Sequence, residues 1–307
     1  MRLNAIIIGC GNIGALYDIE NNQLEITTYI NAISRIPEID LTICDTNTSL
    51  LKRLSKLYKC STISNSDHLN LKKFDIVCIA LPTEFHFKFL KGALNAGVPL
   101  ILLEKPIVSS LFEIEQVEKL VNQNDSFILV NYYRRFQPAY VDLKEKLNRD
   151  FSIKDLSNIV IKYNRGFYNN CSHAIDLIGW LMNIPYNFSN PMVLSRTNDT
   201  FPTDPTINLT FNWSNAFVSC SGITNTNYYI LDIELYFKNG YILLLDGGDK
   251  IVISLNGKKT EQSMFLSTSL KYVIDYALLS FNEDKSRVHS NIQSSIEVLK
   301  AMMKVLK

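Results

Sequence analysis

The first part of the chain alternates short apolar runs with amphipathic segments. The apolar runs predict strands near residues 3–8, 40–44, 74–80, 98–103 and 127–131. Between these runs, apolar positions at helical spacing predict helices such as Thr48 to Leu57 and Phe85 to Ala96. Strands that alternate with helices are typical of a doubly wound parallel sheet, so we predict a Rossmann-like domain over residues 1–125.

After about residue 150 the pattern changes to strands that follow one another through turns. Asn239-Gly240 and Gly247-Gly248 are hairpin-like turn signals. The predicted strands are 158–163, 206–213, 216–222, 228–237, 240–245 and 250–255, and the predicted helices are Ser172 to Met182, 266–281 and 287–306. We therefore expect residues 126–307 to form an α+β domain with a large, mostly antiparallel open sheet.

Composition narrows the classes of protein that fit. A chain of 307 residues with 47% hydrophobic content can fill two cores, and a net charge of +1 offers no basic surface for nucleic acid. The six cysteines are scattered without metal-ligand spacing, which favours reduced thiols in a cytoplasmic protein and no metal site. The N-terminal apolar run is too short for a signal peptide and no stretch approaches the length of a membrane span, so we expect neither.

A glycine loop follows the first predicted strand. Gly9-Cys10-Gly11-Asn12-Ile13-Gly14 has the G-x-G-x-x-G spacing and opens a helix. Gly9 allows a tight turn, Gly11 allows a pyrophosphate to approach the backbone, and Gly14 allows close packing of helix and strand. This context indicates a dinucleotide site.

Asp45 ends the second predicted strand. Its carboxylate could bind both ribose hydroxyls and repel a 2′-phosphate, which favours NAD over NADP, or it could be an ordinary turn aspartate. The distance from Gly14 is longer than usual because of a polar stretch from Asp18 to Glu25, which we interpret as an insertion that could border the active site.

Glu104-Lys105-Pro106 follows the apolar run 98–103. A buried ammonium is costly, so a lysine at a strand end usually meets a ligand or a carboxylate. A loop salt bridge is the alternative to a functional cation beside the cofactor.

The four histidines limit the candidates for proton transfer. His68 and His289 lie in polar segments, and His86 could contact the cofactor or cap a helix. His173 begins a predicted helix and shares a face with Asp176. A neutral imidazole there could take a proton from a hydroxyl as hydride leaves, or could make a structural hydrogen bond.

Together, the glycine loop, Glu104-Lys105-Pro106, the run Tyr133 to Pro138 and His173-Ala174-Ile175-Asp176 resemble the glucose–fructose oxidoreductase / inositol dehydrogenase / rhizopine catabolism (Gfo/Idh/MocA) family. The resemblance implies a Rossmann domain, a nicotinamide cofactor and sugar, cyclitol or nucleotide-sugar substrates. It also implies that Lys105 and His173 are catalytic and that Arg134 contacts substrate.

The chain departs from this pattern at Asn169, where many relatives carry an aspartate four residues before the histidine. An amide cannot stabilise an imidazolium by charge, so we expect Lys105 to have the larger role. The resemblance implies that Asn-Asn-x-Ser-His variants occur among family members associated with surface-polysaccharide and nucleotide-sugar metabolism. The predicted cofactor contacts are Gly9, Gly11, Asn12, Ile13, Gly14, Asp45, Leu81, Pro82, Thr83, His86, Glu104 and Lys105, and the predicted substrate contacts are Arg134, Asn169, Asn170 and Asp176.

The sequence therefore predicts a nicotinamide-dependent dehydrogenase or reductase that forms a homo-dimer or homo-tetramer. Two alternatives remain open. One is a non-catalytic NAD-binding regulator of the same fold, and the other is an imine or biliverdin-type reductase, which needs less base chemistry.

Overall fold

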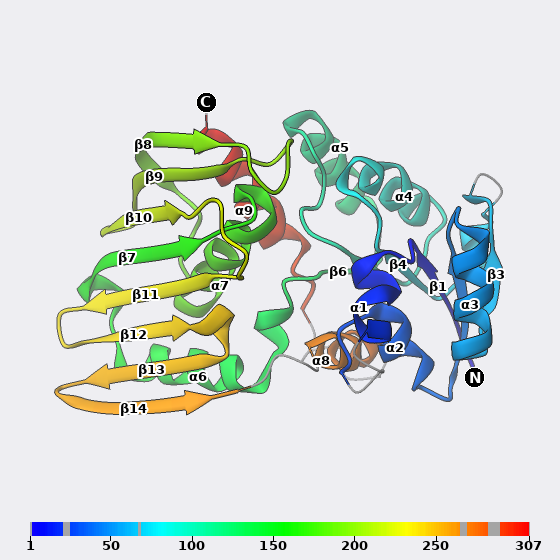
Figure 1. Ribbon diagram of the computed structural model, residues 1–307, viewed down its shortest axis with the longest axis horizontal. Helices are drawn as coiled ribbons and strands as arrows, with labels where there is room; N and C mark the ends of the chain where they lie inside the picture. Colours follow the sequence, from blue (N-terminus) through cyan, green and yellow to red (C-terminus); the bar gives the residue numbers. More distant parts are fainter. Residues whose placement is uncertain (1, 21–24, 67–68, 265–268, 282–288, 307) are drawn as a thin grey trace. The chain divides into compact units, whose positions relative to one another are not determined.

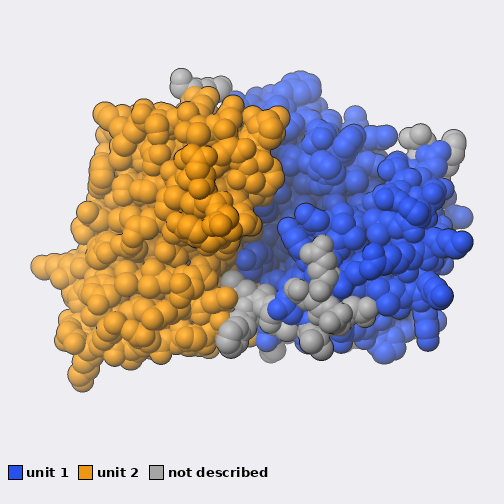
Figure 2. Space-filling model, viewed as in Figure 1, with its two compact units in different colours: residues 1–133, 267–296 blue, residues 134–266, 297–307 orange. Residues whose placement is uncertain are grey.

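The computed structural model describes residues 2–20, 25–66, 69–264, 269–281 and 289–306. The chain forms two compact units, which Figure 2 colours separately. Unit 1 comprises Met1–Tyr133 and Ser267–Ile296, and unit 2 comprises Arg134–Leu266 and Glu297–Lys307. These units differ from the predicted domains, because the first extends beyond residue 125 and takes in a segment from near the end of the chain.

Unit 1 is built on a six-stranded parallel sheet with the order β3-β2-β1-β4-β5-β6 (Figure 1). The strands are β1 Leu3–Ile8, β2 Ile39–Cys44, β3 Ser61–Ile63, β4 Ile76–Ile79, β5 Leu100–Leu103 and β6 Phe127–Val130. The order reverses direction at β1, as in dinucleotide-binding folds. The sequence pattern did not indicate β3, which is a short, mostly exposed edge strand.

The strands of this sheet end at the same level. Ile8 pairs with both Cys44 and Ile79. Ile79 pairs with Leu103, which in turn pairs with Val130. The residues that follow these strands therefore lie along one edge of the sheet, where ligands bind in open α/β folds.

The described helical segments of unit 1 connect these strands, except for the last two, which come from near the end of the chain. They are η1 Asn12–Leu16, α1 Tyr17–Glu20, α2 Tyr29–Ser34, α3 Thr48–Tyr58, η3 Leu71–Lys73, α4 Thr83–Asn95, α5 Leu111–Val121, α8 Ser269–Leu278 and η9 Leu279–Phe281. The late segment joins unit 1 because α8 packs beside α2. In addition, the Asn291 side chain accepts the Val130 N–H at 2.7 Å and donates to the Val130 carbonyl at 2.8 Å.

Unit 2 contains an eight-stranded sheet with the order β14-β13-β12-β11-β7-β10-β9-β8. The strands are β7 Leu156–Tyr163, β8 Phe188–Thr197, β9 Thr206–Trp213, β10 Ala216–Gly222, β11 Leu231–Phe237, β12 Gly240–Leu245, β13 Lys250–Leu255 and β14 Lys258–Ser263. Only β7 and β10 pair in parallel. The predicted α+β domain with a mostly antiparallel sheet is confirmed. The sequence pattern did not indicate β8 or β14, because these edge strands are almost wholly exposed and lack the alternation of a half-buried strand.

Helices cover one face of this sheet. The helical segments are η4 Tyr133–Phe136, α6 Pro138–Asp150, η5 Ile153–Asp155, η6 Phe167–Cys171, α7 Ser172–Met182, η7 Asp246–Gly248 and α9 Ile292–Val305. Ile159, Ile161 and Tyr163 alternate along β7 and join a core that includes the apolar residues of α7. Every residue of α7 except Trp180 is buried, so the polar side chains of this helix need partners inside the protein.

Within the described residues, no helix has the length and apolar character needed to cross a bilayer. The same residues hold no cluster of three or more His, Cys, Asp or Glu side chains that could bind a metal ion.

Candidate functional site

The glycine loop leaves one side of its backbone open. Gly9 has φ +97°, and a Cβ there would lie 2.4 Å from the Ala80 carbonyl oxygen. A Cβ at Gly14 would lie 2.2 Å from the Gly9 carbonyl oxygen. At Gly11, by contrast, a Cβ would meet no described atom within 4 Å. Gly9 and Gly14 are therefore required by the protein's own packing, whereas Gly11 fits the close approach of a dinucleotide phosphate.

Asp45 is tied to this loop. One carboxylate oxygen accepts the Cys10 N–H at 2.8 Å, and the other accepts the Asn47 N–H at 2.8 Å. Burial, and secondarily the Asp45 carboxylate, raise the pKa of Cys10 to about 12, so this thiol stays neutral. The loop thus has a fixed anionic neighbour at the end of β2.

A cavity of about 330 Å³ opens beside Asp45. Its lining combines Asp45 with largely apolar side chains and includes Leu81 and Pro82 from the end of β4. The full lining is Ile8, Cys44, Asp45, Thr46, Ser66, Leu81, Pro82, Phe85 and Phe89. Thr83 begins α4 at the same edge of the sheet. Apolar walls with few polar groups are typical of a cofactor pocket.

His86 connects two loops at this edge. Its side chain is 1% exposed, and its ring nitrogens lie 2.7 Å from the Leu81 carbonyl oxygen and 2.8 Å from the Pro106 carbonyl oxygen. These contacts differ from the predicted cofactor contact and from helix capping. His86 holds the ends of β4 and β5 together, because both nitrogens already face backbone oxygens.

Glu104 is also directed into the protein. Its Oε1 accepts hydrogen bonds from the Tyr29 hydroxyl at 3.0 Å and from Asn131 Nδ2 at 2.6 Å. Burial, with Glu104 as a second cause, raises the pKa of Tyr29. These contacts favour a supporting role for Glu104, and Lys105 follows it in a half-buried position at the end of β5.

Asn131 is a candidate that the sequence reasoning missed. It follows β6 at the same edge, and its Oδ1 is buried without a hydrogen-bond partner among the described residues. A buried oxygen of this kind usually accepts a bond from water or a ligand. The sequence did contain a hint, because Asn131 is a polar residue at the carboxyl end of a predicted strand.

The polar stretch after the glycine loop is anchored by Asp18. This carboxylate is 0% exposed and accepts hydrogen bonds from Thr27, Thr28 and Asn31. Burial alone would raise the pKa of Asp18, but these hydrogen bonds outweigh it and lower the pKa below its ordinary value. Residues 21–24 of the predicted insertion lie outside the described residues.

In unit 2, several strands meet at one end of the sheet. Tyr163, the last residue of β7, pairs with Gly222 at the end of β10 and with Leu231 at the start of β11. The residues that follow β7 lead into η6 and α7, which carry Asn169 and His173. His173 is 8% exposed, and Asn169 Nδ2 donates to the Arg165 carbonyl at 3.0 Å.

Tyr229 brings together two predicted substrate residues. Its hydroxyl donates to Asn170 Oδ1 at 3.0 Å and accepts from Arg134 Nη2 at 3.3 Å. Arg134 also donates to the Gly247 carbonyl, and Asn170 Nδ2 donates to the Asn164 carbonyl at 2.9 Å. These contacts give Arg134 and Asn170 a supporting role, while the half-exposed Tyr229 ring faces outward. Sequence reasoning missed Tyr229, which lay inside a predicted strand.

Asp176 is occupied by an ion pair inside unit 2. Its Oδ2 accepts from Arg135 Nε at 2.6 Å, and its Oδ1 also pairs with the Arg135 guanidinium. Burial raises the pKa of Asp176 to about 6, although Arg135 opposes the shift. The prediction that Asp176 contacts substrate does not fit this burial, because both oxygens are turned toward Arg135.

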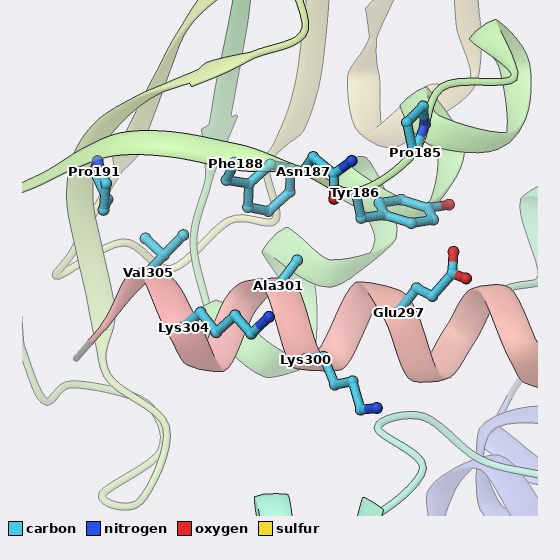
Figure 3. A pocket seen from close by; sticks show the side chains of 10 residues that line it. All are labelled: Pro185, Tyr186, Asn187, Phe188, Pro191, Glu297, Lys300, Ala301, Lys304 and Val305. Carbon is cyan, nitrogen blue, oxygen red and sulfur yellow. The ribbon is translucent and has the colours of Figure 1, made fainter. Parts of the chain in front are cut away.

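Unit 2 also contains a hollow of about 360 Å³ between the start of β8 and α9 (Figure 3). In Figure 3, Ala301 and Val305 point from α9 toward the segment that carries Tyr186 and Phe188. Its lining includes none of the predicted site residues. This hollow is therefore separate from the end of the sheet that carries His173.

Each unit thus gathers its own predicted residues at one end of its sheet. The glycine loop, Asp45, residues 81–83 and Lys105 lie at the edge of the first sheet, and Asn169, Asn170 and His173 lie at the end of the second. Lys105 and His173 belong to different units. Their approach to a common redox carbon stays a prediction.

The chain resembles known proteins in both sequence and fold. Residues 3–132 match the family described as "Oxidoreductase family, NAD-binding Rossmann fold". An inositol 2-dehydrogenase/D-chiro-inositol 3-dehydrogenase of Shouchella clausii is 23% identical over 79% of this chain and 75% of that protein.

Solved structures share the fold of both units. UDP-N-acetylglucosamine 3-dehydrogenase GnnA of Acidithiobacillus ferrooxidans has a TM-score of 0.78 at 15% identity, over 99% of this chain and 97% of that one. A super-repressor mutant of Gal80p from Saccharomyces cerevisiae has a TM-score of 0.77 at 14% identity, over 100% and 95%.

The glycine loop and the strand order define an NAD-binding Rossmann oxidoreductase fold. Residues 3–132 match the model of the Gfo/Idh/MocA oxidoreductase family, in agreement with the family that the sequence motifs predicted.

Proposed function

We propose that this chain transfers a hydride reversibly between a nicotinamide cofactor and a secondary alcohol or ketone carbon of a sugar, a cyclitol or a nucleotide sugar. The observation that carries the proposal is the open face of Gly11, between two glycines that the protein's own backbone encloses. The inositol dehydrogenase and the UDP-N-acetylglucosamine dehydrogenase among its relatives support the substrate class.

The edge of the first sheet would hold the cofactor, which supplies the carbon that accepts or donates the hydride. Gly9 to Gly14 would receive the phosphates, and the Asp45 carboxylate would bind the ribose. Because Asp45 sits beside the loop as a fixed anion, a 2′-phosphate would be repelled, and we propose NAD rather than NADP.

Lys105 would act on the reacting oxygen. An ammonium at the end of β5 favours negative charge as it develops on a carbonyl oxygen, and this interaction is stronger in the transition state than in the ground state. Such a contact is worth roughly 2–4 kcal/mol of barrier. Lys105 would therefore carry most of the stabilisation that this chain's own residues provide.

His173 would move the proton. During oxidation the imidazole would take the hydroxyl proton as the hydride leaves the same carbon, and during reduction it would return that proton. The nearby surface suits a hydroxylated ligand, because the 44%-exposed Tyr229 ring lies beside amide side chains. Arg134 and Asn170 would shape this surface by holding Tyr229.

The test is NADH consumption over a panel of ketosugars, ketocyclitols and ketosugar nucleotides. We expect turnover of at least one of them, and we expect Lys105→Met to lower it by roughly two to three orders of magnitude with NADH affinity largely intact. Lys119→Met, an exposed lysine of α5, is the matched control. Turnover that is unchanged in Lys105→Met would remove Lys105 from the chemistry.

Two other functions are outcomes of the same assay. NADH binding without turnover of any compound would favour the non-catalytic regulator, a function that the neutral Asn169 and the fold of Gal80p allow. Turnover of imines or bilins alone would favour the reductase alternative.

We also propose a homo-dimer or homo-tetramer formed through the outer face of the unit 2 sheet. Phe217 and Tyr236, which are 49% and 36% exposed, both pair with Asn158 and so lie on one face. Exposed aromatic side chains on an open sheet are typical of an interface. Light scattering coupled to gel filtration would give the mass, and a monomer would contradict this proposal.

A further inference from the structure

The helical run that carries His173 begins against a carboxylate from another part of the chain. Asp204 lies in the connection between β8 and β9. One of its oxygens accepts the Tyr168 N–H at 2.8 Å, and the other accepts the Asn169 N–H at 2.7 Å. Both N–H groups belong to η6, which continues directly into α7. Asp204 therefore caps this run with both of its oxygens.

The backbone around the cap is shaped to admit it. Gly166 has φ +90°, and a Cβ at this position would lie 2.3 Å from Asp204 Oδ2. The Phe167 N–H donates to the Pro205 carbonyl at 3.0 Å, and the Gly166 N–H donates to the Thr206 hydroxyl at 3.3 Å. Four hydrogen bonds thus join the segment from Asp204 to Thr206 to the start of η6.

The position of this charge matters for His173. N–H groups at the start of a helix form a positive end, which disfavours a protonated imidazole in the first turns. His173 is four residues after Asn169, one helical turn or about 6 Å along the axis. Asn169 itself is uncharged and donates its amide to Arg165. A negative charge at this turn therefore comes from Asp204.

Two other ionisable groups on this run, Asp176 and Cys171, are compensated or neutral, whereas the cations Arg165 and Arg196 also lie around it. Asp176 on α7 is paired with Arg135, and burial raises the pKa of Cys171 well above its ordinary value. The charge of Asp204 also acts on Tyr168 in η6: burial first and Asp204 second raise the pKa of Tyr168, and Arg196 opposes the shift. Arg134 and Tyr229 are held in their own contacts beside Asn170.

We propose that Asp204 is a positioning residue for His173: its carboxylate fixes the first turn of the helical run and favours the protonated imidazole during proton transfer. This inference rests on the proposed function, in which His173 alternates between neutral and protonated forms. The Asp204 carboxylate would supply the negative charge that the uncharged Asn169 lacks.

The experiment is an NMR titration of the His173 imidazole in the full chain, with the resonance assigned from its loss in His173→Gln. We expect Asp204→Asn to lower the His173 pKa by about half a unit or more. Asp199→Asn is the matched control, because Asp199 lies in the same connection but binds the Thr206 hydroxyl instead. It should leave the titration unchanged.

Two further variants separate charge from folding. Asp204→Ser keeps a hydroxyl that can cap a helix start, so it should also lower the His173 pKa while circular dichroism stays native. Asn169→Asp placed in the Asp204→Asn background should restore the pKa, because it returns a carboxylate to the same turn. A His173 pKa within 0.1 unit of the wild-type value in both folded neutral variants would overturn the inference.

A kinetic readout separates this inference from the proposed function. If the chain turns over a ketosugar, Asp204→Asn should lower kcat about tenfold, with the KM for NADH unchanged. The titration needs no turnover. An inert protein whose His173 pKa still depends on Asp204 would refute the proposed function alone, and an active enzyme with an unshifted His173 would refute this inference alone.

Discussion

The two units bring polar groups together at one end of a sheet by different means. In unit 1 the backbone does most of this, because five strands end in register and Gly9 and Gly14 allow the tight loop that follows β1. In unit 2 side chains bring the polar groups together. Asp204, Tyr229 and Arg135 form hydrogen bonds with Asn169, Asn170 and Asp176, which are remote from them in sequence. A site formed by the backbone can be recognised from a short sequence motif. A site formed by side chains that are remote in sequence depends on the whole fold.

The largest expected effect comes from breaking the side-chain network of unit 2. Arg135→Met leaves the Asp176 carboxylate buried without its counter-ion, so we expect the free energy of unfolding to fall by about 3–5 kcal/mol. Both tryptophans, Trp180 and Trp213, lie in unit 2, so their fluorescence during urea unfolding reports on this unit.

Arg149→Met is the control for this variant. Arg149 pairs with Asp150 on the surface, and its loss should leave the free energy of unfolding nearly unchanged. Equal stability losses in the two variants would contradict the importance of the buried pair.

A smaller effect is expected at Asp18, the point where unit 1 also depends on a side chain. Asp18→Asn should lower the free energy of unfolding by about 2 kcal/mol at neutral pH, because it replaces a buried acceptor of several hydrogen bonds. Asp40→Asn, on the exposed side of β2, is the matched control. Urea unfolding followed by circular dichroism measures both.

The difference in free energy of unfolding between wild type and Asp18→Asn should depend on pH, and the direction of this dependence follows from the pKa of Asp18. Because the folded pKa of Asp18 is below its ordinary value of 3.8, the unfolded chain binds the proton more tightly. The stabilisation is therefore complete well above pH 3.8 and is lost as the pH falls through the folded pKa. A gap between wild type and Asp18→Asn that widens on acidification would refute this account of the carboxylate.

The smallest effect is expected in the glycine loop. Variants there distinguish glycines that are needed for packing from a glycine that is needed for ligand binding. Gly11→Ala adds a Cβ into space that no described atom fills, so folding should be unaffected while NADH binding weakens about tenfold or more. Gly14→Ala should weaken binding and also lower the melting temperature, because its Cβ would meet the Gly9 carbonyl oxygen. Calorimetry measures both quantities, and normal NADH affinity in Gly11→Ala would show that no phosphate lies there.

Sequence reasoning succeeded where the pattern was local. The parallel sheet, the glycine loop and the helix from Ser172 to Met182 followed from short-range spacing, and the structure confirms these elements. The edge strands β8 and β14 were missed because exposed strands lack an apolar stripe.

The supporting contacts could not be predicted, because their partners are remote in sequence. Asp176 was placed with substrate from its position beside His173, but its partner Arg135 lies 41 residues earlier. His86 was expected to contact the cofactor or cap a helix, and the structure instead gives its ring two backbone carbonyls. A residue's position in a motif indicates its neighbourhood, and its hydrogen bonds decide its role.

The most direct test of the central claim is a double-mutant cycle of Lys105→Met and His173→Gln, followed by single-turnover hydride transfer from NADH. If both groups act on one redox carbon, their losses are coupled, and the double variant should be about as slow as the slower single variant. Losses that multiply, or a single variant with an unchanged rate, would contradict the joint action of Lys105 and His173.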